Sequence, residues 1–353
     1  GNTPIAIGCA SLLLWAVHFL VLRGIKEAAF INQVTTVAKV VPLLLFIFIA
    51  AAAFRMDIFT RDIWGLSNPS FGSVLDQVRN MMLVTVFVFI GIEGASIFSS
   101  RAEKMADVGK ATMIGFALSI LLFVAVSMLS LGVLSQPELA ALKNPSTAGV
   151  LKAAVGDWGA ALMNAGLVIS VGGALLAWTL LAAEVPYLAG KDGTMPAFLG
   201  KTNAKGAPVN ALLLTNGLVQ LFLIITLFNS STYLSLLYLA TSMILVPYFW
   251  SSAYGVLLAV RGETYENAGG ERNKDLLIAL ISSIYAIWLV YAAGIQYLLL
   301  SALLYAPGAI LFAKAKRELG QPVFTGVEKI IFVAVLIGAA IAAYGLYDGF
   351  LSL

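Results

Sequence analysis

Three ionisable side chains lie inside long apolar segments of this 353-residue chain, where lipid would surround them: Lys39, Glu93 and Glu184. A charge at the centre of a bilayer costs about 2.5–3.5 kcal/mol unless it faces a cavity or a partner, so such residues usually mark the path of an ion or a charged substrate. All three are therefore candidate functional residues. For Glu184, which lies nearer the end of its segment, a structural acid at the membrane interface is an equally good interpretation.

Glu93 has the most informative neighbours, because Gly91 and Gly94 bracket it. Glycine relaxes the backbone, so the helix can unwind there and turn its carbonyl and amide groups toward a ligand. Broken helices in lipid line cavities, and in secondary transporters their ends form the substrate site. Small residues that let two helices approach closely are the alternative. That alternative explains the glycines but not the acid between them.

Aromatic and other polar residues add weaker signals. Trp178 follows a glycine pair and Tyr248 follows Pro247, both too deep in their segments for the interfacial belt that Trp and Tyr often form. Core packing stays open for both. We expect His18 to donate a helix–helix hydrogen bond or to serve in packing. One histidine and one cysteine cannot build a metal cluster or an internal disulfide. A membrane-embedded enzyme would need clustered His, Cys or Asp, so we expect no catalytic residue, no metal and no cofactor.

The elements that position these residues follow from composition. The chain is 60% hydrophobic and 11% charged, and its mean hydropathy is +0.95, whereas about a quarter of an ordinary soluble domain is charged. This excludes a soluble enzyme and a nucleic-acid-binding protein. A membrane helix needs roughly 20 apolar residues. Ten apolar segments approach that length, at about 4–22, 29–54, 80–99, 111–134, 158–189, 209–228, 234–260, 276–293, 296–313 and 327–347. We therefore expect an all-α integral membrane protein with about ten transmembrane helices.

Lysine and arginine are unevenly shared between alternate loops, and this asymmetry predicts orientation. One set of loops carries 15 of the 21 basic residues and the other set carries five. Because cytoplasmic loops are enriched in Lys and Arg, the loop after the first segment is expected inside the cell and the N-terminus outside. The chain also begins without a methionine directly before a membrane segment, so we expect an odd number of helices to be missing upstream.

Four stretches resemble a known superfamily. They are FIGIEGAS at 89–96, SRAEKMADVGKAT at 100–112, WTLLAAE at 178–184 and GKDG at 190–193. They are similar to the amino acid–polyamine–organocation superfamily, and within it to the basic amino acid/polyamine antiporters of the arginine–ornithine group. The resemblance implies a leucine-transporter-like inverted-repeat fold in which family helices one and six are unwound. Aligned on Glu93, this chain would lack the first three family helices. It would form one membrane transporter domain over 1–353, with a remnant of the first repeat at 1–54, the second repeat at 77–261 and C-terminal helices at 275–353.

The resemblance also implies roles for single residues. Carbonyl groups of Phe87, Ile90 and Gly91 would bind the α-ammonium of the substrate, and the Phe87 ring would stack over its distal cation. Trp178 would lie beneath the substrate, with Glu184 also near the distal cation.

Three further residues match gating and coupling positions. Glu93 would be the gate acid and Tyr248 the gate tyrosine. Lys39 would occupy the place where sodium-coupled relatives bind an ion, and so would support sodium-independent exchange.

The function implied is secondary active transport of cationic amino acids, arginine against ornithine or a lysine-like pair, by alternating access across a bacterial inner membrane. The partners would be cationic amino acids and membrane lipid, with no nucleic acid; a homodimer is left open. Two alternatives stay open, a proton-coupled amino acid symporter of the same superfamily and a non-transporting membrane subunit. Because half of the substrate cradle would be absent, we expect these 353 residues alone not to transport.

Overall fold

The first two long helices show how the sequence sets element boundaries. The computed structural model describes residues 3–65, 72–227, 233–263, 265 and 269–351. Helix α1 (Pro4–Arg23) begins where the Thr3 hydroxyl accepts a hydrogen bond from the Ala6 amide at 3.3 Å, with proline in the first turn. Gly24, with φ +154°, ends α1, and α2 (Ile25–Ala52) starts at the next residue. Gly24 alone makes the turn between the two helices, because only glycine adopts this backbone conformation without strain.

The chain forms two compact units, each built of helices. The first comprises Gly1–Val74 and Gly91–Ser230, and the second Leu75–Ile90 and Ser231–Leu353. After α1 and α2, the first unit contains α3 (Met56–Phe59), α5 (Gly94–Ile97), η2 (Ser99–Arg101), α6 (Met105–Val133), α7 (Gln136–Ala140), α8 (Ser146–Val155), α9 (Asp157–Lys191), η3 (Ala197–Gly200) and α10 (Val209–Ile225).

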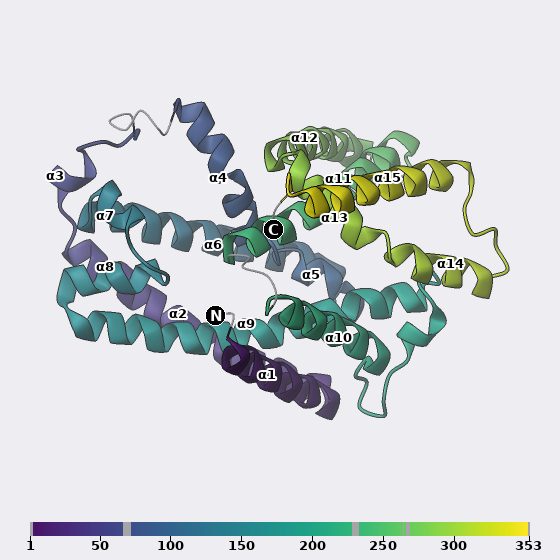
Figure 1. Ribbon diagram of the computed structural model, residues 1–353, viewed down its shortest axis with the longest axis horizontal. Coiled ribbons are helices and arrows are strands. Elements are labelled where there is room, and N and C mark those ends of the chain that lie inside the picture. The colour runs from purple at the N-terminus through teal and green to yellow at the C-terminus, as the bar shows by residue number, and fades with distance from the viewer. Residues whose placement is uncertain (1–2, 66–71, 228–232, 264, 266–268, 352–353) are drawn as a thin grey trace. The chain divides into compact units, whose positions relative to one another are not determined.

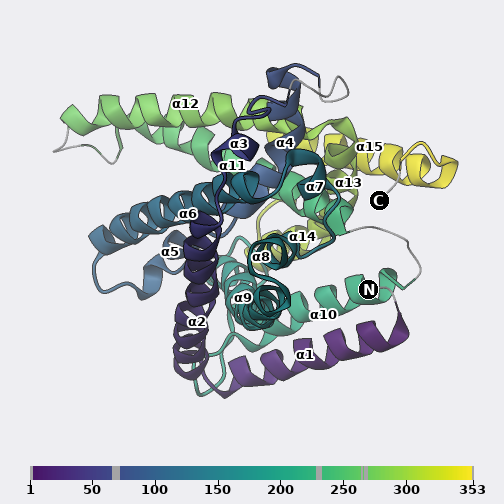
Figure 2. The same ribbon diagram turned by 90° about the vertical axis from the view of Figure 1, so that its left-hand side faces the viewer.

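Helix α9 is the centre of the first unit, because α2, α8, α10 and η3 all pack on it. Helix α1 lies alongside α10, as two views of the molecule show (Figures 1 and 2). One apolar core forms around Phe46, Leu151 and Met163, and a second around Val21, Leu176 and Leu212. The unit is therefore a helical scaffold assembled around α9.

Close packing of α2 on α9 depends on glycine. A Cβ atom added at Gly166 would lie 2.5 Å from the Cβ of Pro42, and one added at Gly173 would lie 2.7 Å from the Cβ of Thr35. Real Cβ contacts are essentially never this short, so α2 occupies the space that a side chain would need. The two contacts also fix the register: the helices run antiparallel, with residue 42 opposite 166 and residue 35 opposite 173.

The second unit contains α4 (Val74–Phe89), α11 (Tyr233–Arg261), α12 (Gly269–Ala293), α13 (Ile295–Tyr305), α14 (Gly308–Glu318) and α15 (Gly326–Asp348). Helix α11 packs on α12 and α13, and α13 packs on α15. Leu83 of α4, Leu245 of α11 and Leu289 of α12 share its apolar core. The Thr241 hydroxyl also donates to the Leu83 carbonyl at 3.2 Å, which ties α4 to α11.

Among the described residues, seven helices are long and apolar enough to cross a membrane, or eight if the bent pair α13–α14 is one span. Ten segments were expected from the sequence, and each of the ten lies on a helix or helix pair of the structure. The two that fall short as continuous spans do so for visible reasons. The segment at 80–99 is interrupted between α4 and α5, and the segment at 209–228 is the 17-residue α10. The all-helical membrane fold is confirmed.

Candidate functional site

The predicted helix break at Gly91–Gly94 is confirmed. Helix α4 ends at Phe89 and α5 begins at Gly94, with four residues of turn between them. Gly91 has φ +107°, a conformation that L side chains rarely adopt. Backbone that leaves the helical path inside a membrane exposes hydrogen-bonding groups, which must be satisfied by protein, water or ligand. The break therefore has the geometry of a binding element.

Backbone hydrogen bonds in the break are rearranged around Glu93. In an intact helix the Gly91 N–H would donate to the Phe87 carbonyl. Here the Phe87 carbonyl instead accepts from the Ile90 N–H at 3.2 Å. The Gly91 N–H donates to Oε2 of Glu93 at 2.8 Å, and the Gly91 carbonyl accepts from the Gly94 N–H at 3.0 Å. A side-chain carboxylate thus replaces a main-chain carbonyl as the partner of the Gly91 amide.

This contact identifies a structural task for Glu93 that the sequence did not reveal. A hydrogen bond to a charged group contributes about 1.5–3 kcal/mol, and an unsatisfied buried amide costs a similar amount. The carboxylate therefore stabilises the unwound conformation two residues before it. Glu93 is also only half-buried, so a ligand that reached the break would meet its charge.

Trp178 on α9 packs directly against the break. A Cβ atom placed on Gly91 would lie 3.4 Å from Cζ2 of the Trp178 ring, and one placed on Gly94 would lie 3.6 Å from Cδ1 of Leu181. Trp178 and Leu181 are three residues apart, so both lie on the same face of α9. The indole stays 45% exposed, although it touches the break. The first unit thus combines an irregular backbone, a carboxylate and an accessible aromatic face.

The other predicted residues lie in several places. Phe87 and Ile90 are at the carboxyl end of α4, and Tyr248 follows Pro247 inside α11; all three belong to the second unit. Within the described residues, no hydrogen bond reaches the Ile90 carbonyl. Of the eight candidates, the structure brings together Gly91, Glu93 and Trp178.

Lys39 lies in the α2–α9 interface. It is four residues after Thr35 and three before Pro42, the two residues that contact glycines of α9, so it shares their face of the helix. The register places Lys39 opposite positions 169–170 of α9. The Lys39 side chain is half-buried, as its place beside α9 requires.

Glu184 is buried, with 2% of its surface exposed, near the carboxyl end of α9. It is about 14 residues beyond the level of Lys39, or about 21 Å along the helix axis. The two charged groups therefore occupy separate levels of α9. Trp178 lies between these levels, six residues before Glu184.

A ladder of polar contacts joins α1 and α10, and apart from His18 its residues were not predicted from the sequence. The Trp15 indole N–H donates to Oε1 of Gln220 at 3.0 Å, and the Gln220 amide donates to the Ser11 hydroxyl at 2.9 Å. The Asn216 amide donates to Nδ1 of His18 at 3.1 Å, and both side chains are buried. His18 thus makes a helix–helix hydrogen bond, as expected, but it accepts this bond instead of donating it. The sequence did contain a signal for these contacts: the spacing of Ser11, Trp15 and His18 places all three on one face of α1.

Comparison with known proteins places this geometry in context. A family model described as amino acid permease matches residues 1–336. The chain is 67% identical to an arginine/ornithine antiporter of Pseudomonas aeruginosa, with all of this chain and 74% of that protein aligned. It is 43% identical to an L-lysine transport protein of Corynebacterium glutamicum, covering 97% of this chain and 71% of the relative. It is 39% identical to an arginine/agmatine antiporter of Chlamydia trachomatis, covering 99% and 72%.

Proposed function

The chain belongs to the amino acid permease family, and on this premise we propose that it exchanges cationic amino acids, arginine against ornithine in particular. It is a multi-pass membrane transporter and not an enzyme. The relatives named above carry arginine, ornithine, lysine or agmatine in their names, and all four are cations with a charged group at the end of an aliphatic chain. The single observation that carries the proposal is the unwound segment at Gly91 beside the exposed ring of Trp178.

The chemistry of the substrate suggests a task for each group. A dibasic amino acid has an α-ammonium, a carboxylate and a distal cation, and each must lose water to enter the protein. We assign the α-ammonium to the carbonyl groups of Phe87, Ile90 and Gly91, since a carbonyl has two lone pairs and can accept a second hydrogen bond. The distal cation would lie against an aromatic face, which attracts cations by about 0.5–2 kcal/mol. Phe87 and Trp178 supply such faces.

The gating roles follow from the same contacts. Glu93 holds the Gly91 amide, so a cation bound at the neighbouring carbonyls would compete for the carboxylate and alter the break. We propose that Glu93 couples occupancy to closure in this way, with Tyr248 as a gate on α11. Glu184 is buried on α9, six residues beyond Trp178, and its carboxylate would compensate the charge of the distal cation.

The test is an exchange assay with the protein expressed from its complete coding sequence. Proteoliposomes loaded with ornithine should take up labelled arginine, and empty vesicles should not. Uptake into empty vesicles that collapses with a protonophore would favour proton symport instead. Equal uptake of leucine would contradict recognition of the cation. No uptake under any gradient, from protein that is correctly inserted, would favour a non-transporting subunit.

The domain division and the oligomer are separate proposals. We propose that residues 1–54 and 77–261 derive from two inverted repeats, with 275–353 as C-terminal helices. We also propose a homodimer, which the mass of the detergent-solubilised particle would test.

A further inference from the structure

An open apolar pocket lies in the wedge between the bent helix pair α13–α14 and helix α15. Helices α13 and α14 meet at Ala306–Pro307 with a bend of 43°, and the pocket in the wedge has a volume of about 280 Å³. Its walls include the small side chains of Ala306 and Ala309. An apolar cavity of about 150 Å³ already holds benzene, so this space takes a larger apolar group.

Three phenylalanine rings form one side of the wedge. Phe324 stacks on Phe312 at 5.7 Å between ring centroids and on Phe332 at 4.6 Å. The rings come from α14, the following loop and α15, so the stack holds these elements together. It also gives the pocket a rigid apolar surface, which suits a hydrocarbon chain better than a polar metabolite.

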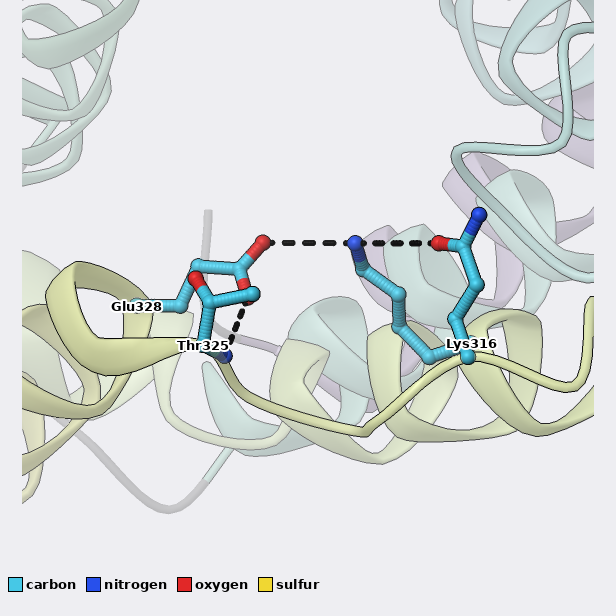
Figure 3. A network of polar contacts seen from close by, with 4 residues as sticks. Lys316, Thr325 and Glu328 are labelled. Carbon is cyan, nitrogen blue, oxygen red and sulfur yellow. Dashed lines mark hydrogen bonds and ion pairs between the residues drawn. The ribbon is translucent and has the colours of Figure 1, made fainter.

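Lys316 lies beside the pocket residues Phe312 and Glu328, where a network of polar contacts fixes its position (Figure 3). The ammonium of Lys316 lies 3.3 Å from Oε1 of Glu328, 3.4 Å from Oε1 of Gln321 and 5.3 Å from the centre of the Phe312 ring. Glu328 is itself held by the Thr325 N–H at 2.6 Å. A lysine ammonium has three donors, and the contacts with Glu328 and Gln321 use two of them. The third is available to an anion beside the pocket.

The depth of the pocket follows from helix lengths. The path from Ile295 to Phe312, which bends by 43° between α13 and α14, is about 27 Å long and comparable to the thickness of the hydrocarbon core. The residues after Phe312 therefore emerge at the headgroup level. They include Lys314 and Arg317, both exposed, and Lys329 is exposed in the first turn of α15. With Lys316, the segment from 314 to 329 carries four cations against two carboxylates, Glu318 and Glu328, so it is net basic. The excess of lysine and arginine in this set of loops predicts that this end of α14 and α15 lies on the cytoplasmic side.

We propose that this wedge binds an anionic glycerophospholipid of the cytoplasmic leaflet. Its phosphate would lie among Lys316, Arg317 and Lys329, and part of one acyl chain would occupy the pocket beside the phenylalanine stack. Basic pockets between helices at the cytoplasmic face suit anionic headgroups, and each lysine or arginine near the surface adds about 1 kcal/mol. The site is independent of which amino acid the protein carries.

The proposal is tested by native mass spectrometry of the purified protein in neutral detergent with added phosphatidylglycerol, phosphatidylethanolamine or inorganic phosphate. Phosphatidylglycerol should bind and raise the unfolding midpoint, whereas the zwitterionic lipid and phosphate alone should do neither. Lys316→Gln should weaken phosphatidylglycerol binding about five-fold, since it removes one surface cation. Ala309→Leu should weaken it by filling the pocket while all charges stay in place.

Lys143→Gln is the matched control, since Lys143 is an exposed lysine in a loop of the opposite set. It should bind phosphatidylglycerol like the unmodified protein. Equal binding of both phospholipids, full binding by both Lys316→Gln and Ala309→Leu, or stabilisation by phosphate alone would each overturn the proposal. The unfolding midpoint of each variant without lipid separates lost binding from lost folding.

Discussion

At the residue scale, the contact between Glu93 and the Gly91 amide changes how an acid in a membrane helix is interpreted. Its place in an apolar segment made Glu93 a candidate functional residue, and the family resemblance implied a gating role for it. The structure adds a second purpose, since the same carboxylate satisfies an amide that the break has released. The two tasks are compatible when Glu93 releases the Gly91 amide during transport. They predict different effects of substitution.

Glu93→Ala should destabilise the protein and abolish exchange, because the Gly91 amide loses its partner. The expected loss is about 1.5–3 kcal/mol of unfolding free energy. Glu93→Gln keeps an acceptor oxygen, so it should recover most of the stability but not the exchange rate. Thermal unfolding in detergent and arginine–ornithine exchange measure the two effects. Glu103→Ala, at an exposed loop acid, is the control; if Glu93→Gln exchanged at the normal rate, the negative charge would have no part in coupling.

Substitution of Gly91 and of Gly94 provides a matched pair of variants, which tests whether transport needs the backbone conformation of the break. Gly91→Ala forces a side chain onto a residue with φ +107° and against the Trp178 ring, which costs about 1–3 kcal/mol or straightens the break. Gly94→Ala meets only Leu181, at an ordinary contact distance of 3.6 Å. We expect Gly91→Ala to lose exchange and Gly94→Ala to keep it. Equal activity of the two variants would mean that the positive φ of Gly91 is not needed for transport.

At the element scale, the α2–α9 interface explains why some glycines cannot change. Gly173 faces Thr35 of α2, whereas a Cβ added at the adjacent Gly172 would have no atom within 4 Å. Gly173→Ala overpacks the interface and should cost about 1–3 kcal/mol. Gly172→Ala should be neutral or slightly stabilising, since alanine favours helix. Chemical unfolding of the two variants side by side checks the difference, and a neutral Gly173→Ala would show that α2 can shift without cost.

Lys39 belongs to the same interface, and its prediction concerns transport rather than stability. Lys39→Ala should abolish exchange while membrane insertion stays normal, because the interface around it is held by Thr35 and Pro42 against glycines of α9. The amount of protein in the membrane and the exchange rate are measured on the same cells. Lys152→Ala, at an exposed lysine outside the membrane segments, is the control. Normal exchange by Lys39→Ala would remove Lys39 from the mechanism.

Elements were predictable from the sequence where one local pattern decided them. Long apolar runs predicted the helices, and the acid between Gly91 and Gly94 predicted the break. The bend at Ala306–Pro307 was not predicted, because the run at 296–313 was interpreted by its continuous hydrophobicity, although the Pro307–Gly308 pair is a local signal for a helix break. The short helices α7 and α8 were also missed, since they lie between spans and have no apolar run of spanning length.

At the scale of the whole molecule, less could be predicted from the sequence, because the site combines residues that are distant in the chain. Trp178 meets Gly91 across 87 positions, and Asn216 meets His18 across 198. Neither contact follows from spacing or composition. Trp178 was a candidate because of its depth in an apolar segment and because of the family resemblance, whereas Asn216 and Gln220 belonged to no quoted motif and were missed. Periodicity supplied the helix faces, but only the fold shows which faces meet.

The charge of the loops predicts how the molecule is oriented in the membrane. The basic residues divide 15 to five between alternate loops, and this excess should hold the basic loops in the cytoplasm. In a cysteine-free background, with Cys9→Ser in this chain, Lys143→Cys should react with a membrane-impermeant maleimide added to intact cells. Lys205→Cys, exposed in a loop of the basic set, should react only after the membrane is opened. The two positions control each other for reactivity, because both are exposed and both lie in the first unit. The reverse labelling pattern would invert the topology, and it would move the basic segment around Lys316 to the outer leaflet.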